Sequence, residues 1–119
     1  VSEMSLPLTP FMLAAAYEYL RTTPPFRGWK LPHADEVKFA VNRHPVNMGT
    51  CQGGATCTIE ISAATVGHTD TMLRTMAHEM IHLRQFLHGE ENSSQHNVDF
   101  KRKAAQVCRY HGWDVRVFI

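Results

Sequence analysis

The sequence predicts an α+β domain, with one helix first, two or three strands after it and two helices in the second half. Changes in hydrophobic period carry this prediction. Apolar residues recur at helical spacing early in the chain, alternate with polar residues in the middle and return to helical spacing beyond it. We expect a single domain over residues 1–119, because 119 residues are enough for one hydrophobic core.

The first helix is predicted to follow Thr9 and to end near Thr22. Threonine is a favourable N-cap, and Pro10 suits the first helical position because the N–H that proline lacks has no partner there. Pro24 and Pro25 then stop the helix, because proline cannot extend it.

Two strands are predicted next. Residues 37–41 alternate between apolar and polar side chains, as a half-buried strand does. Residues 56–62 (TCTIEIS) also alternate and are rich in β-branched side chains. Because Gly53-Gly54 marks a tight turn, we expect this second strand to pair with the segment before the turn. The alternation in residues 115–119 predicts a short final strand.

Two helices are predicted in the second half. The first spans 69–88 and is stopped by Gly89, which suits the left-handed position after a helix. The second begins at His96 or Asn97 and ends at Gly112. Its apolar stripe consists of Phe100, Ala104, Val107, Cys108 and His111.

Composition places the chain among ordinary globular proteins, with 44% hydrophobic and 19% charged residues. The net charge of +1 gives no global attraction to nucleic acid. No apolar run is long enough to cross a bilayer and no signal-peptide pattern begins the chain, so we expect no membrane association. Three cysteines without a C-x-x-C pair predict reduced thiols and a cytoplasmic (intracellular) location.

The stretch AHEMIH, residues 77–82, contains the pattern H-E-x-x-H. On a helix, His78 and His82 lie one turn apart on the same side, so both imidazoles can bind one ion. Glu79 lies about 100° around the helix, close enough to reach a metal-bound water without binding the metal. An apolar side opposite the histidines is expected from Leu73, Met76, Met80, Leu83 and Leu87. In a chain with eight histidines this pattern can also arise by chance.

A catalytic zinc site usually has three protein ligands, so a third should follow on another element. His88 lies on the same helix as His78 but roughly three turns further along, too far to bind the same ion. Glu90 and Glu91 come in the loop directly after the helix. His96 follows a loop long enough for the chain to reverse, so it is the favoured third ligand.

The run AHEMIHLRQ, a polar loop and then HNVDFK at 96–101 together resemble the SprT-like zinc metalloprotease family, which includes the Spartan proteases. In that family the H-E-x-x-H helix is followed by a histidine-glycine-x-x-phenylalanine segment whose histidine is the third zinc ligand. Phe100 matches the phenylalanine, and Asn97 stands where the family usually has glycine. The resemblance assigns Glu79 as the catalytic carboxylate and His78, His82 and His96 as ligands of one Zn²⁺.

The resemblance covers about Thr56 to Gly112 and implies a zincin-like metalloprotease core. That core has a small, mostly antiparallel sheet, an active-site helix and two further helices. Many family members continue into a zinc ribbon or a DNA-binding extension. This chain ends soon after Trp113 and so resembles the catalytic core alone. Residues 58–61 either border the cleft as an edge strand or lie inside the sheet.

The resemblance implies a zinc metallopeptidase that hydrolyses peptide bonds with a zinc-activated water, Glu79 acting as general base. Its partner is a protein or peptide substrate, including proteins associated with DNA. Lys101, Arg102 and Lys103 form either a solvated helix face or a weak DNA contact. Candidates for an additional oxyanion donor, each also explained by a structural role, are His68, Arg84, Tyr110 and His111.

Two other functions remain open. One is a non-catalytic zincin-fold binding or regulatory module with a structural zinc, although such a site has no need for a carboxylate at Glu79. The other is a zinc hydrolase that acts on a bond other than the peptide bond.

Overall fold

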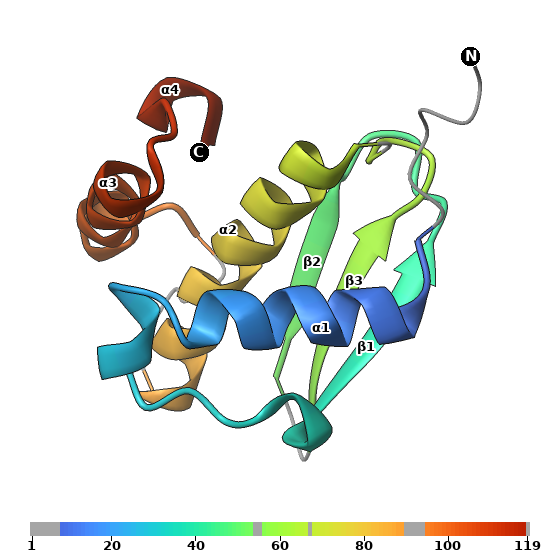
Figure 1. Cartoon of the computed structure of the whole chain (residues 1–119), viewed down its shortest axis with the longest axis horizontal. Helices are drawn as coiled ribbons and strands as arrows, with labels where there is room; N and C mark the ends of the chain where they lie inside the picture. The colour runs from blue at the N-terminus through green and yellow to red at the C-terminus, as the bar shows by residue number, and fades with distance from the viewer. Residues whose placement is uncertain (1–7, 54–55, 67, 90–94, 119) are drawn as a thin grey trace.

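The computed structural model describes residues 8–53, 56–66, 68–89 and 95–118. It confirms the α+β class, with a three-stranded sheet and helices packed beside it (Figure 1). The elements in chain order are α1 (Pro10–Arg21), β1 (Val37–Asn42), β2 (Gly49–Gln52), β3 (Cys57–Ser62), α2 (Thr69–Leu87), α3 (Val98–His111) and α4 (Val115–Phe118). Two short 3-10 helices, Phe26–Gly28 and Ala34–Glu36, connect α1 to β1.

Helix α1 has the predicted start and end. The N-cap is Thr9, whose side chain accepts a hydrogen bond from the backbone N–H of Met12 at 3.1 Å. The C-cap is Thr22. The buried face of α1 carries Tyr17, whose hydroxyl donates to the Pro32 carbonyl oxygen at 2.6 Å. This bond ties the helix to the connection that leads into β1.

The sheet has the strand order β1-β3-β2. Strands β2 and β3 pair antiparallel, with Gly49 opposite Ile61, which confirms the pairing expected across the glycine turn. Strands β1 and β3 pair in parallel, with Val37 opposite Cys57. The sheet is therefore mixed rather than mostly antiparallel. Strand β3 lies between β1 and β2, which run in opposite directions, so it is parallel to one neighbour and antiparallel to the other. Strand β3 is the central strand, so β1 and β2 are the two edges of the described sheet, and β2 is the edge that contacts α2.

Helix α2 lies between the sheet and the pair formed by α3 and α4 (Figure 1). Met76, Met80 and Leu83 of its predicted apolar side are fully buried, whereas Leu87 near the end is 45% exposed. Gly89 follows with φ +68°, as expected of the left-handed residue after a helix. None of the helices in the described ranges is both long and apolar enough to cross a membrane.

Helix α3 confirms the predicted second helix of this half, with Asn97 as its N-cap and Gly112 left-handed at its end. The residues that follow form the helical turn α4, so the predicted strand over 115–119 is wrong for Val115–Phe118, and Ile119 lies outside the described residues. Asp114 explains the difference. Its carbonyl oxygen accepts from the N–H of Phe118 at 3.1 Å, and its side chain accepts from the N–H of Arg116 at 2.9 Å. These capping bonds, together with the burial of Phe118, outweigh the alternation of the segment.

Candidate metal centre

Helix α2 carries two histidines on the face turned toward α3 and α4. The ring centroids of His78 and His82 lie 5.1 Å apart, as one-turn spacing requires. His82 is 8% exposed and His78 is half-buried. This face is therefore enclosed by other elements rather than open to solvent.

His96 completes the cluster from the segment that leads into α3. Its Nε2 lies 3.1 Å from Nε2 of His78, and its ring stacks on Phe100 with centroids 4.4 Å apart and an interplanar angle of 9°. One ligating atom from each of His78, His82 and His96 lies within 4.8 Å of the other two. The expected triad is thus brought together and could hold a metal ion.

The chemistry of this donor set fits Zn²⁺. Nitrogens bound to one tetrahedral zinc at about 2.0–2.1 Å are about 3.4 Å apart, which is close to the spacing of the cluster. Burial, aided by the neighbouring His82 and His96, lowers the pKa of His78 to about 4. Burial and the nearby Lys101 also lower the pKa of His96. Both imidazoles are therefore neutral near pH 7, which is the form that binds metals.

The backbone of α4 orients His78. Nδ1 of His78 lies 3.0 Å from the carbonyl oxygen of Phe118. A carbonyl can only accept, so we place the proton on Nδ1, and this leaves the Nε2 lone pair directed to the cluster. Such a hydrogen bond to a metal-binding histidine fixes its tautomer and the orientation of its ring.

Glu79 lies beside the histidines and is 5% exposed. Burial raises the pKa of its carboxyl group to about 8. Glu79, His78 and His96 line one pocket of about 640 Å³. The arrangement therefore places a carboxyl group and two of the three imidazoles at a single cavity large enough for several atoms of a bound chain.

The loop before β2 also lines this pocket, through Met48 among other residues, and so does Gly49, the first residue of β2. Gly49 allows a close approach, since a Cβ there would lie 2.9 Å from Cγ2 of Thr75 and 3.2 Å from the carbonyl oxygen of Glu60. The loop before β2 and the start of that edge strand therefore border the pocket, while residues 58–61 lie inside the sheet.

Arg74 was not predicted from the sequence, and it also lines the pocket. Its Nε donates to Asp70 at 3.0 Å. The signal was available, because position 74 is one helical turn before His78 and so shares the face of His78 and His82. It brings a cation to the mouth of the site.

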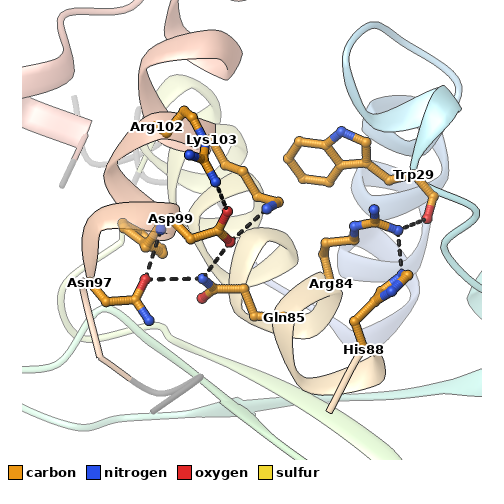
Figure 2. A network of polar contacts seen from close by, with 9 residues as sticks. Trp29, Arg84, Gln85, His88, Asn97, Asp99, Arg102 and Lys103 are labelled. Atoms are coloured by element: carbon orange, nitrogen blue, oxygen red, sulfur yellow. Dashed lines mark hydrogen bonds and ion pairs between the residues drawn. The ribbon is translucent and has the colours of Figure 1, made fainter. Parts of the chain in front are cut away.

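The other sequence candidates lie elsewhere. Figure 2 shows His88 beside Arg84, whose guanidinium contacts the His88 ring and donates to the carbonyl oxygen of Trp29 at 2.8 Å. His111 lies 3.2 Å from the Thr23 hydroxyl. None of the four candidate oxyanion donors is among the described residues that line the pocket. These candidates are His68, Arg84, Tyr110 and His111. Of the alternative third ligands, Glu90 and Glu91 lie outside the described residues.

Comparison with known proteins supplies the family. No curated protein matches this chain. A sequence model of the SprT-like family matches residues 14–117, which extends well beyond the part from Thr56 to Gly112 on which the resemblance was based. The match includes most of α1 and the three described strands as well as the histidine cluster. The chain therefore belongs to the SprT-like family.

Proposed function

We propose that this protein is a zinc-dependent metallopeptidase in which His78, His82 and His96 bind the metal and Glu79 is the general base. One observation carries the proposal. Three imidazoles have ligating atoms within 4.8 Å of one another, and two of them, His78 and His96, line a pocket together with the buried carboxyl group of Glu79. Membership of the SprT-like family supports the same function.

The residues of the site divide the work. Zn²⁺, when bound, supplies a Lewis acid that polarises the scissile carbonyl and lowers the pKa of a water molecule to about 7. The positive charge of a bound Zn²⁺ would offset the effect of burial and favour the carboxylate form of Glu79. Glu79 would then accept the proton of the attacking water on a carboxylate oxygen and deliver it to the leaving amine nitrogen. The pocket lined by α2 and by the loop before β2 would hold the substrate.

Replacing Glu79 by Gln tests this role. The variant should still bind zinc, because the three histidines are unchanged, but peptide hydrolysis should fall by about 10²–10⁴-fold with the loss of the general base. Zinc content is measured by metal analysis and hydrolysis with a generic protein substrate. The control is Glu60→Gln on β3, which removes a carboxylate outside the pocket and should change neither property. Undiminished cleavage by Glu79→Gln would exclude Glu79 as the base.

The same experiment separates the enzyme from its main rival. A non-catalytic binding module with a structural zinc would bind the metal in every variant and hydrolyse no peptide bond even in the natural sequence. The buried position of Glu79 at the pocket favours the enzyme, because burying a carboxyl group is unfavourable and a structural zinc site does not need one there.

Proteins associated with DNA are the substrate class that the family resemblance supports, and we extend the proposal to them. Asp99 pairs with Lys103 at 2.6 Å and with Arg102 at 2.5 Å, so these two cations are partly neutralised. Arg102, Lys103 and Arg109 also line a shallow groove on α3. Cleavage of DNA-binding proteins with and without single- or double-stranded DNA tests the extension. Equal rates in all three conditions would limit the proposal to peptide bonds in general.

A further inference from the structure

A polar side chain lies fully buried where α2 meets α3. Gln85 is 0% exposed and is located three residues after His82, near the end of the face that carries the histidines. Its Nε2 donates to Oδ1 of Asn97 at 3.2 Å and to Oδ2 of Asp99 at 2.9 Å. Figure 2 shows these bonds reaching from α2 to the first turn of α3. A buried amide without such bonds would be strongly unfavourable, so they fix how the two helices meet.

The bond to Asn97 acts next to the third histidine of the cluster. Asn97 directly follows His96 and is the N-cap of α3, and its Oδ1 also accepts from the N–H of Phe100 at 2.9 Å. One side-chain oxygen therefore receives both the capping bond of α3 and the bond from Gln85. This fixes the backbone on one side of His96, and the ring of Phe100 supports the imidazole.

Asp99 strengthens the same connection. Its carboxylate accepts from Gln85 and is held in place by Lys103 at 2.6 Å and Arg102 at 2.5 Å. An acidic residue in the first turn also stabilises a helix electrostatically. Gln85 thus binds two groups that set the position of the start of α3, and both lie within three residues of His96.

We propose that Gln85 is a positioning residue that keeps His96 in place for metal binding through its hydrogen bonds to Asn97 and Asp99. The inference rests on the proposed function, because it requires the three histidines to bind a metal. It adds that the third ligand depends on an amide carried by the helix of the other two ligands. A purely structural tie between the helices would change stability but would leave the metal ligands unchanged.

Gln85→Met tests the inference, since methionine has a similar volume and no donor. The whole chain is titrated with Co²⁺, followed by visible absorption, and its Zn²⁺ affinity is measured by competition with a chelator. Zn²⁺ affinity should fall about 10–100-fold, as for other groups that orient metal ligands. The Co²⁺ spectrum should shift toward that of His96→Ala. The control is Gln106→Met, which changes a half-buried glutamine of α3 outside this network and should leave both readouts unchanged.

A second variant serves if Gln85→Met does not fold. Asn97→Ser keeps a good N-cap, but its side chain is too short to reach both partners. It should reduce Zn²⁺ affinity about tenfold with little change in the melting temperature of the metal-free protein. Natural affinity and an unchanged Co²⁺ spectrum in these variants, with only a lower melting temperature, would overturn the positioning role. Absence of any Zn²⁺ or Co²⁺ binding by the natural sequence would instead reject the proposed function, and the positioning role with it.

Discussion

The two parts of the histidine cluster are held by different means. His78 and His82 belong to α2, which is buried against the sheet and α1, and helical spacing alone brings them together. His96 is exposed and comes from a separate segment, where its position depends on Phe100 and on the bonds made by Asn97. A short motif can therefore preorganise two ligands, whereas the third needs tertiary contacts that the motif does not contain.

Removing one ligand from each part should give the largest effect. His82→Ala and His96→Ala should each lower Zn²⁺ affinity by about a hundredfold or more, which exceeds the effect of changing a group that only orients a ligand. The metal-free proteins should differ. His82→Ala leaves space in a buried region and should lower the melting temperature, while His96→Ala changes an exposed side chain and should not. Full zinc retention by His96→Ala would move the third ligand to another residue.

A substitution in α4 tests how His78, on α2, is held in place. Phe118→Ala removes a ring that is 4% exposed and should lower the free energy of unfolding by about 3 kcal/mol. It should also lower Zn²⁺ affinity about tenfold, because the Phe118 carbonyl that accepts from His78 is no longer held firmly. Chemical denaturation and zinc competition measure the two effects. Val117→Ala, in the same turn but 63% exposed, is the control and should change neither. A loss of stability with unchanged zinc affinity would show that α4 does not help to orient His78.

The smallest effect should come from the charge beside the third ligand. Burial alone would raise the pKa of Asp99, but hydrogen bonds from Lys103, Gln85 and Arg102 outweigh it and hold the pKa well below its usual range. A carboxyl group with a lowered pKa stabilises the fold above its unfolded pKa of about 4, and this stabilisation is lost as the pH falls through the folded value.

Asp99→Asn should therefore lower the free energy of unfolding by about 1 kcal/mol at pH 7, and the difference from the natural sequence should shrink below about pH 4. Denaturant titrations from pH 7 to pH 3 measure it. Asp70→Asn is the control, because the Asp70 side chain is 69% exposed and its ion pair with Arg74 should contribute little. A difference that stays constant down to pH 3 would show that the charge of Asp99 is not its source.

The histidine cluster was largely predictable because its members have strong positional requirements. His78 and His82 follow from helical spacing, and His96 follows from the need for a reversing loop before a third ligand. Gln85 belongs to no motif, so only the contact between α2 and α3 shows its role. The carbonyl of Phe118 is a backbone group, and every residue has one. Arg74 could have been found from its spacing to His78.

The fold was predictable wherever local signals agree. Thr9 with Pro10, Gly89 and Gly112 mark helix ends by backbone chemistry that acts within a few residues. The position of β3 between β1 and β2 depends on contacts distant in the sequence, so alternation identified the strand without placing it in the sheet. The alternation in Val115–Phe118 misled the prediction because a single capping residue, Asp114, sets the local backbone.

The strand order also constrains the order of events during folding. Strands β1 and β2 come first in the chain, yet in the described sheet each is paired with β3. On a growing chain neither has its hydrogen-bonding partner until residues 57–62 have emerged, and α2 follows directly afterwards. Parallel pairing over such a separation is slow because the loop must close before any bond forms. Completion of the sheet and assembly of the helix that bears the first two histidines are therefore expected to be nearly simultaneous during synthesis.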